Sequence, residues 1–495
     1  MFRLRGFVAA IVLWAASVAW AQPSADLLPW PEADVTITDL LRGETEHGKL
    51  VYGFAAAMTR AGCHVAKLEG ERGKMVVRLD GKRGKTYAEI PALSDPVFSP
   101  DGSALGYSVF EAGGSFVVIN EREGPKFEEI YAKTFTFSAD GKRHAYVAKK
   151  DGRRVAVIDG VVQADGGGDL IPCVQPPAFS VNGSSVGYLE VSLPERKMRA
   201  VVNGKPGEAF GEYGLSLGFS PDGLRFYQSA REGNRCFCVV DGKKGEAFNN
   251  LGIDFVFSPD GKKIAYVGFR GGQRFLVVEG APTVEIEGIV DGTLTFSPDS
   301  RRLAYGAARR DRRCYFVVDG KAGPVYDSVG AAIPRGLSPN VTSTQNGYGL
   351  GGSGVVFSPD SSRFAYVADT GGKKVVVVDG KPEDVEMDFL VGGIIFSADS
   401  RRLAYGGRQG GKFFLVVDGK KGADYDALGH FEFSQDGTHI AFVAKKGDQN
   451  VIVVDGKQRA KYIVVPAGPV FRSDGTLEFL ATDESSLNRI EVKSP

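Results

Sequence analysis

Residues that build metal centres, redox sites and disulfide frameworks are scarce in this chain. Its 495 residues include five cysteines, five histidines and three tryptophans. Five scattered cysteines are too few for a disulfide framework in an exported protein. The histidines show no H-x-H or HExxH spacing, which a zinc centre would need; they are His47, His64, His144, His430 and His439. We therefore expect no metal and no cofactor.

An excess of charge of one sign is also absent, and so are long apolar runs beyond the first residues. The 60 basic residues balance 60 acidic ones, so no global field attracts nucleic acid or a membrane surface. Residues 1–21 carry Arg3 and Arg5, then an apolar run over 7–18, then Ala19-Trp20-Ala21. This order is typical of a secretory signal peptide. We expect an exported chain, in a bacterial periplasm or outside the cell, without a transmembrane segment in its mature part.

What the chain has in abundance is a repeated Phe-Ser-Pro-Asp-Gly motif. Copies follow one another about 40 residues apart, with one wider step between Phe296 and Phe357. A period of this length with strand-like patterns is typical of propellers and solenoids. The copies begin at Phe98, Phe137, Phe179, Phe219, Phe257, Phe296, Phe357, Phe396 and Phe433, with a Phe-Arg variant at Phe471.

The stretch 254–288 predicts the structure of one repeat. Apolar strands are expected at 255–257, 263–267 and 275–278, with a Ser-Pro-Asp-Gly turn after the first. Asp-Gly, or Glu279-Gly280 here, follows the third strand and indicates a hairpin. An alternating fourth strand over 283–287 suits an outer edge. The third strands are continuously apolar, so both of their faces should be buried against neighbouring repeats. The repeat is predicted to be a four-stranded propeller blade.

The number of repeats bears on how the ring closes. With a degenerate first copy over 50–81, we count eleven, and the last copy ends without a fourth strand. Residues 31–40 resemble the fourth strand at 382–390, so the N-terminal segment is expected to supply the missing strand beside 487–492. The fold class is therefore all-β, a β-propeller closed as one large ring. Since propellers usually have about 4–8 blades, two rings remain the alternative.

This reading divides the chain into five parts. A signal peptide (1–21) precedes an N-terminal segment with the ring-closing strand (22–47) and seven propeller repeats (48–330). A Gly/Ser/Asn-rich insertion (331–354) then separates these from four further repeats (355–495).

Three other patterns are interpreted as structural. The repeated aspartates stand one to a repeat beside their own turns, which favours turn chemistry over calcium binding. Cys236, Cys238 and Cys314 lie on third strands at apolar positions and are expected to be buried. A G-x-S-x-G match at 214–218 lies inside a predicted strand with no helix after it, so it lacks the context of a nucleophile elbow.

The Phe-Ser-Pro-Asp-Gly, Ile-Ala-Tyr-Val and Val-Val-Asp-Gly pattern, clearest over 257–280, 296–320 and 396–419, resembles the TolB-type, WD-repeat-like β-propeller family of bacteria. The resemblance implies blades in nearly the whole mature chain. It also implies a role as an envelope scaffold or an accessory module. The motif describes the fold and says little about function.

Two features suggest a binding surface. Loops between second and third strands are basic in most repeats and should gather on one face of a propeller, where they would attract an acidic protein or an anionic envelope polymer. The insertion is expected to join a fourth strand to the next first strand and so to emerge on the same face, and it carries polar side chains able to bind a sugar or peptide. The candidate residues in the loops are Arg153, Arg154, Arg231, Arg235, Arg270, Arg274, Arg309, Arg310, Arg312, Arg313, Lys373, Lys374, Arg408 and Lys412. Those in the insertion are Arg335, Asn340, Gln345, Asn346 and Tyr348.

Two functions follow as hypotheses. The first is a non-enzymatic exported scaffold that binds a protein or polymer through the basic loops. The second is a propeller enzyme of the lyase, lactonase or hydrolase type with its site at the central channel. First-strand positions expected near the axis are apolar, which favours the scaffold; they include Phe135, Leu217, Phe255, Leu294, Val355 and Ile394. His430 and Glu432 are the nearest exception.

Overall fold

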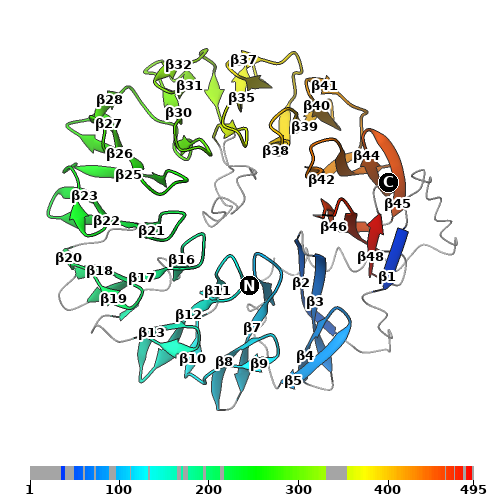
Figure 1. The fold of residues 1–495 in the computed structure, drawn as a ribbon, viewed down its shortest axis with the longest axis horizontal. Coiled ribbons are helices and arrows are strands. Elements are labelled where there is room, and N and C mark those ends of the chain that lie inside the picture. Colours follow the sequence, from blue (N-terminus) through cyan, green and yellow to red (C-terminus); the bar gives the residue numbers. More distant parts are fainter. Residues whose placement is uncertain are drawn as a thin grey trace, which may run out of the picture.

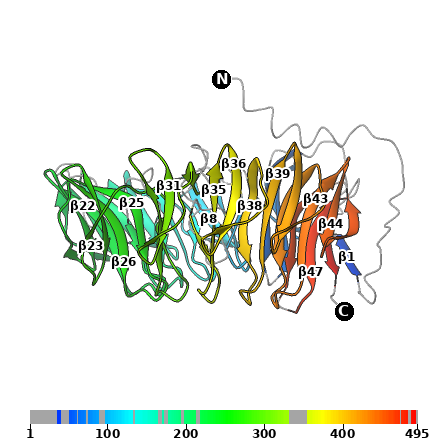
Figure 2. The same cartoon turned by 90° about the horizontal axis from the view of Figure 1, so that it is seen from above.

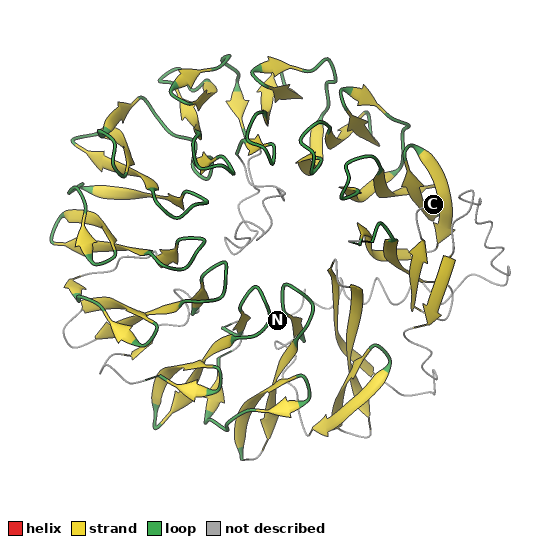
Figure 3. Cartoon of the chain, viewed as in Figure 1, coloured by secondary structure: helices red, strands yellow, loops and turns green. Residues whose placement is uncertain are grey.

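The described strands form a single ring of radial sheets. The computed structural model describes residues 35–39, 50–59, 62–71, 74–87, 96–111, 113–131, 134–163, 169–170, 177–192, 197–211, 217–330, 354–462, 464–472, 474–482 and 487–492. Within these ranges the strands form eleven antiparallel sheets around one centre (Figure 1). Figure 3 shows strands and loops and no helix in the part of the chain that it colours. The fold is an all-β propeller, and the two-ring alternative is wrong.

The first six sheets follow one another along the chain. Sheet 1 contains β2 (Leu50–Thr59), β3 (Gly62–Glu71), β4 (Lys74–Leu79) and β5 (Lys82–Tyr87); sheet 2 β6 (Val97–Phe98), β7 (Leu105–Glu111), β8 (Gly114–Ile119) and β9 (Arg122–Glu123); sheet 3 β10 (Glu129–Ile130), β11 (Thr136–Phe137), β12 (His144–Lys150), β13 (Arg153–Ile158) and β14 (Val161–Val162); sheet 4 β15 (Asp169–Leu170), β16 (Ala178–Phe179), β17 (Val186–Ser192), β18 (Lys197–Val202), β19 (Lys205–Pro206) and β20 (Phe210–Gly211); sheet 5 β21 (Leu217–Phe219), β22 (Phe226–Glu232), β23 (Arg235–Val240) and β24 (Lys243–Lys244); sheet 6 β25 (Asn250–Phe257), β26 (Ile264–Arg270), β27 (Gln273–Val278) and β28 (Val284–Ile286).

The other five sheets complete the ring. Sheet 7 contains β29 (Thr295–Phe296), β30 (Leu303–Ala308), β31 (Cys314–Val318) and β32 (Lys321–Ala322); sheet 8 β33 (Ser328–Val329), β34 (Val356–Phe357), β35 (Phe364–Thr370), β36 (Lys373–Val378) and β37 (Lys381–Pro382); sheet 9 β38 (Phe389–Phe396), β39 (Leu403–Gln409), β40 (Lys412–Val417) and β41 (Lys420–Lys421); sheet 10 β42 (Ala427–Phe433), β43 (Ile440–Lys446), β44 (Gln449–Val454) and β45 (Lys457–Tyr462); sheet 11 β46 (Val464–Phe471), β47 (Leu477–Thr482), β48 (Leu487–Val492) and β1 (Val35–Asp39).

Sheet 6 confirms the repeat that the sequence predicts. Its strands β25, β26, β27 and β28 are hydrogen-bonded in chain order and contain the four predicted segments, apart from terminal residues. The Asp-Gly hairpins also have the expected backbone, since both residues have positive φ, as at Asp379 (50°) and Gly380 (81°). Positive φ at both central positions is the type I′ geometry that matches the twist of paired strands.

The third strands are buried on both faces, as their unbroken apolar sequence predicts. In β36, Val375, Val376 and Val377 are at most 5% exposed. Val375 and Val377 pack in a core shared with sheet 7, whereas Val376 packs in a core shared with sheet 9. Each sheet therefore contributes to two cores. Burial of each such side chain contributes about 1.5–3 kcal/mol.

A Ser-x-Asp turn joins first to second strand in most sheets. The Ser358 hydroxyl donates to Asp360 Oδ1 at 2.6 Å and accepts the Arg363 N–H at 2.9 Å. Asp360 Oδ1 also accepts the Ser362 N–H at 3.0 Å. The bond from Ser358, followed by that from the Ser362 N–H, lowers the pKa of Asp360 to about 2. A serine hydroxyl likewise lowers the pKa of Asp140, Asp222, Asp260, Asp299, Asp399 and Asp436. The repeated aspartates are turn residues, as predicted.

An arginine five residues after the turn serine joins neighbouring sheets. Arg225 Nε donates to Asp241 of its own sheet at 2.8 Å, and its Nη1 donates to the Lys262 carbonyl of sheet 6 at 2.8 Å. The guanidinium also forms two hydrogen bonds with Glu279 and lies 5.6 Å from the Phe257 ring centre. We call this arrangement the arginine clamp. It recurs, without a counterpart of Glu279, at Arg143, Arg302, Arg363 and Arg402.

The chain's two ends meet in sheet 11, which confirms the predicted strand donation. β1 pairs antiparallel with β48, from Val35 opposite Val492 to Asp39 opposite Asn488. Sheet 11 lies between sheet 10 and sheet 1. β46 contacts β42 and β43 of sheet 10, and β46 and β47 contact β2 and β3 of sheet 1. Figure 1 shows the blue β1 beside the red β48 at the outer edge of the ring.

Proline at two successive positions of β1 should loosen this closure. In Thr36→Pro/Ile37→Pro, one of the two lost N–H groups faces β48, because successive N–H groups of a strand point to opposite sides. Each lost ladder bond costs about 0.5–1.5 kcal/mol. We expect a lower Tm and faster hydrogen exchange over 487–492, with the matched alanine pair as control. Unchanged exchange in this segment would contradict the pairing.

The structure places the ends of the insertion differently from the sequence prediction. Residues 331–354 were expected to join a fourth strand to the next first strand, and thus to emerge from the face of the basic loops. Instead β33 and β34, which flank the insertion, both pair with β35, so both are parts of the first strand of sheet 8. The chain therefore enters and leaves the insertion from the innermost strand. The insertion, apart from Gly354, lies outside the described residues, as does the predicted signal peptide.

The cysteines on third strands are buried or half-buried, as predicted. Cys236 and Cys238 are 7% and 1% exposed, and Cys314 is half-buried; all three are free. Burial raises the pKa of the Cys238 thiol to about 12, so it behaves as an apolar group. Cys173 and Ser216, the serine of the G-x-S-x-G match, lie outside the described residues, and nothing is described of the Cys63 side chain. The described residues contain no helix with the length and apolarity that a membrane-spanning segment needs.

Candidate binding face

The ring has two unlike faces, because four up-and-down strands place alternate connections on opposite sides (Figure 2). The first, which we call the turn face, carries the Ser-x-Asp turns, the Asp-Gly hairpins and the arginine clamps. The second, the loop face, carries the loops between second and third strands and the connections from each fourth strand to the next sheet. The arginine clamps connect neighbouring sheets at the turn face.

All the basic residues predicted from the loops lie at the loop face. They stand at the ends of second strands or the starts of third strands: Arg153, Arg154, Arg231, Arg235, Arg270, Arg274, Lys373, Lys374, Arg408 and Lys412. Arg309, Arg310, Arg312 and Arg313 form the connection between β30 and β31. The five candidates in the insertion, Arg335, Asn340, Gln345, Asn346 and Tyr348, lie outside the described residues.

Acidic residues neutralise part of this basic set. Lys373 pairs with Asp388 at 2.5 Å, and Lys412 pairs with Asp426 at 2.7 Å. Hydrogen bonds from these lysines lower the pKa of both carboxyl groups. Arg270 lies 3.7 Å from Glu246, and its guanidinium stacks 4.8 Å from the Phe275 ring centre. These three acids lie outside the loops between second and third strands, after the short strands β37, β41 and β24, so the loop sequences alone gave no sign of them.

These acids also connect neighbouring sheets. Asp388 Oδ2 accepts the N–H of Gly410 in the next loop at 2.9 Å, and Asp426 Oδ2 accepts that of Gly447 at 2.7 Å. Asp327 does the same for Gly371 at 2.8 Å. These carboxylates thus have a structural role as hydrogen-bond acceptors for the loops. Lys373 and Lys412 neutralise the negative charge of two of them and are less available to a partner.

The loop of sheet 7 carries four arginines and one acid, Asp311. The Asp311 carboxylate lies 3.4 Å from Arg309 and accepts the Arg313 N–H at 3.0 Å. Arg310 and Arg312 are exposed, and no ion pair reaches either side chain within the described residues. The Glu287 carboxylate accepts the Arg310 backbone N–H at 3.1 Å, but the exposed guanidinium groups of Arg310 and Arg312 are available to carboxylates or phosphates of a partner. Arg310 and Arg312 are therefore the best candidates for a contact.

First-strand residues offer less chemistry. Leu217, Leu294, Val355 and Ile394 are buried apolar side chains, whereas Phe135 and Phe255 are half-buried. The exception foreseen is present, since His430 Nε2 lies 3.5 Å from Glu432 Oε2.

Asp254 is another carboxyl residue on a first strand. Asp254 accepts the Gly292 N–H at 2.8 Å, and burial raises its pKa. Among the described residues no three His, Cys, Asp or Glu side chains converge as metal ligands would. The carboxyls found near first strands thus have local structural partners.

Comparisons with known proteins identify relatives of the fold alone. Neither a family model nor a curated protein sequence matches the chain. Among solved structures, a eukaryotic initiation factor aligns with TM-score 0.40 and 13% identity over 78% of this chain and 97% of its own. The Dos1 propeller aligns with TM-score 0.29 and 8% identity, covering 64% and 91%. The β-propeller domain of the Trilobed protease from Pyrococcus furiosus aligns with TM-score 0.24 and 13% identity, covering 65% and 93%. None of these similarities bears on function.

Proposed function

We propose that the chain is an exported, non-enzymatic scaffold of the TolB type that binds an acidic protein or anionic envelope polymer through its loop face. Its contact centres on Arg310 and Arg312. The support for export is the signal-like pattern of residues 1–21, and the support for TolB-type membership is the repeated motif. The observation that carries the binding proposal is the pair of exposed guanidinium groups without a carboxylate partner in the described structure.

Charge reversal at this loop tests the proposal. Arg310→Glu/Arg312→Glu removes two cations and adds two anions at the loop face. We expect binding to immobilised heparin, used as a generic polyanion, to weaken about tenfold at low salt. Elution should occur at a lower salt concentration, because exposed charge contacts are screened by salt.

A matched control changes the same net charge on the other face. Lys262 and Arg401 belong to turns of the turn face and have side chains 81% and 86% exposed. Lys262→Glu/Arg401→Glu should retain most heparin binding. If both double variants lose binding equally, net charge rather than the loop face governs the interaction, and the assignment is wrong.

A further inference from the structure

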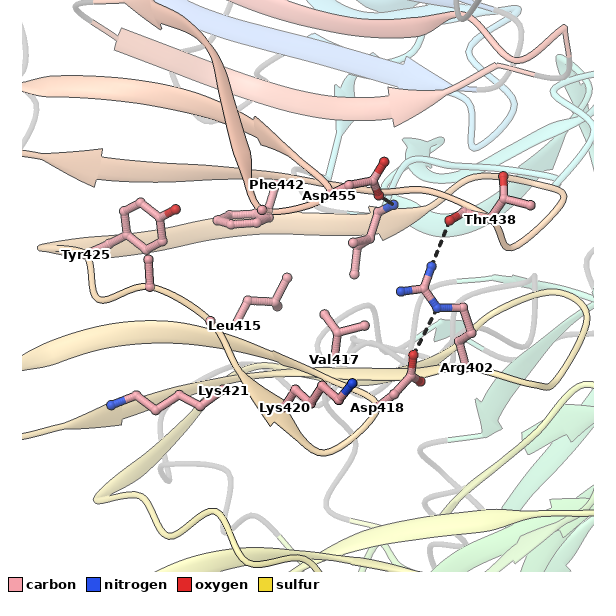
Figure 4. Close-up of a pocket in the computed structure, with 14 residues that line it drawn as sticks. Arg402, Leu415, Val417, Asp418, Lys420, Lys421, Tyr425, Thr438, Phe442 and Asp455 are labelled. Atoms are coloured by element: carbon pink, nitrogen blue, oxygen red, sulfur yellow. Dashed lines mark hydrogen bonds and ion pairs between the residues drawn. The ribbon is translucent and has the colours of Figure 1, made fainter.

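A pocket lies at the joint, or junction, between the neighbouring sheets 9 and 10, away from the loop face. Its volume is about 510 Å³, within the range of small-molecule sites. Leu415 and Val417 of β40 face Phe442 of β43 across the opening, with Lys420 and Lys421 along one rim (Figure 4). We call it the joint pocket; its other lining residues are Arg402, Asp418, Gly422, Ala423, Tyr425, Thr438, Ile440, Asp455 and Gly456.

At several other junctions between sheets a tyrosine hydroxyl reaches the neighbouring hairpin, and the corresponding side chain at the pocket is a phenylalanine. At the joint of sheets 8 and 9, the Tyr405 hydroxyl donates to Glu383 at 2.6 Å. At that of sheets 5 and 6, the Tyr266 hydroxyl lies 3.0 Å from where a Cβ on Gly245 would be. Phe442 has the same register as these tyrosines, since each faces a third-strand valine. It has no hydroxyl to reach the neighbouring hairpin.

The neighbouring hairpin is also smaller at this joint. A Cβ added to Gly422 would meet one atom within 4 Å, the Leu415 carbonyl oxygen of its own sheet. Ala423 follows it, where the corresponding hairpins of sheets 5 and 7 have Glu246 and Pro324. The space beside Gly422 is thus left open by two small residues and one missing hydroxyl. Its walls are apolar, because Leu415, Ile440 and Phe442 belong to the core between the sheets.

The two carboxylates at the mouth already have hydrogen-bond partners. Asp418 accepts hydrogen bonds from Arg402 Nε at 3.0 Å and from the Leu403 N–H at 2.9 Å. Asp455 likewise has His439 Nδ1 at 2.7 Å and accepts the Ile440 N–H at 3.0 Å.

The two lysines differ in this respect. Lys421 lies 3.1 Å from Asp424 and over the Phe414 ring, at 4.2 Å. Lys420 is exposed and has no ion pair within the described residues. A ligand's anionic group would therefore meet one available ammonium beside an apolar cavity.

We propose that the joint pocket binds a small amphiphile with an apolar body and one carboxylate or sulfonate group. The apolar body lies against the half-buried Val417 and the exposed edges of Leu415 and Phe442, and the anion lies against Lys420. The site uses the outer part of the turn face, so it goes beyond the proposed function at the loop face. Its failure would leave that function untouched.

Titration of the whole protein with 1-anilinonaphthalene-8-sulfonate, an apolar anion that fluoresces when desolvated, tests the site. We expect one saturable site from which decanoate displaces the probe. Val417→Phe fills the pocket and should weaken binding about tenfold. Lys420→Gln should weaken it about threefold, the size of an exposed charge contact. The uncharged N-phenyl-1-naphthylamine should respond to Val417→Phe and not to Lys420→Gln.

Lys381→Gln is the matched control, because Lys381 follows Asp379-Gly380 in sheet 8 as Lys420 follows Asp418-Gly419 in sheet 9. It should leave both probes unaffected. Circular dichroism and Tm show whether Val417→Phe is folded. If it is not, Lys420→Gln, which changes an exposed residue, still tests the site. Wild-type binding by Val417→Phe, equal effects of Lys381→Gln and Lys420→Gln, or no saturable binding would overturn the proposal.

Discussion

Replacing Ser258, Ser358 and Ser397 by alanine is expected to destabilise the protein more than any other change considered. All three serines are fully buried, and each accepts one backbone N–H, from Lys263, Arg363 and Arg402, at 2.9–3.0 Å. A buried donor without its acceptor costs about 1–3 kcal/mol, and three turns are affected at once. Thermal unfolding at neutral pH should show a Tm lower by several degrees.

The loss should depend on pH in one direction. The serine hydroxyl holds the pKa of the turn aspartate below its unfolded value, as low as about 2 at Asp360. A depressed folded pKa contributes stability above the unfolded pKa of about 4 that is lost as pH falls toward the folded pKa. The Tm difference between wild type and triple variant should therefore be largest above pH 4 and shrink toward pH 2.

Thr295→Ala is a suitable control for this experiment. The Thr295 hydroxyl donates to the Phe296 carbonyl at 3.3 Å and touches no carboxylate in the described structure. Its effect on Tm should be similar at all pH values. A triple variant whose Tm deficit stays constant from pH 7 to pH 2 would show that the serine–aspartate bonds do not stabilise the charged form.

The second large effect is expected for Arg225→Ala. The guanidinium is 23% exposed and bonds two carboxylates and the backbone of the next sheet. Hydrogen bonds to charged groups contribute about 1.5–3 kcal/mol each. The bonds of one guanidinium are not additive, so we expect the free energy of unfolding to fall by about 2–4 kcal/mol. Hydrogen exchange should rise in both sheet 5 and sheet 6.

Two variants distinguish the clamp from a general effect of charge. Arg225→Lys keeps the charge but cannot bond Asp241, Glu279 and a carbonyl at the same time, so it should recover only part of the loss. Arg235→Ala removes an exposed arginine at the loop face of the same sheet and should change Tm little. Equal Tm values for Arg225→Ala and Arg235→Ala would refute the role of the clamp.

Local patterns made the fold predictable. The Ser-x-Asp-Gly turn and the Asp-Gly hairpin determine the backbone over a few residues, and apolar strands between them follow from burial on both faces. The similarity of 31–40 to 382–390 was enough to predict β1, since a fourth strand pairs in the same way in every sheet. The position of the insertion was mistaken, because Ser328-Val329 is too short to be recognised as part of a first strand.

The sites were harder to predict, because they depend on what faces what across a joint. The arginine clamps have a sequence signal, an arginine five residues after the turn serine, as at Arg143 and Arg402. The aspartate that each clamp arginine bonds belongs to an Asp-Gly hairpin, and its role in the hairpin already explained its presence in the sequence. The joint pocket arises because Phe442 has no hydroxyl and Ala423 has a small side chain. Neither feature indicates a pocket until the residues that face them in the neighbouring sheet are known.

The arginine clamp also affects how such a ring changes in size. At the five junctions where it is described, the clamp bonds main-chain carbonyls, such as those of Lys262 in sheet 6 and Thr438 in sheet 10. Every module presents such carbonyls whatever its side chains. The clamp would therefore survive the duplication or deletion of a module, whereas the apolar cores between sheets would have to form anew at its borders.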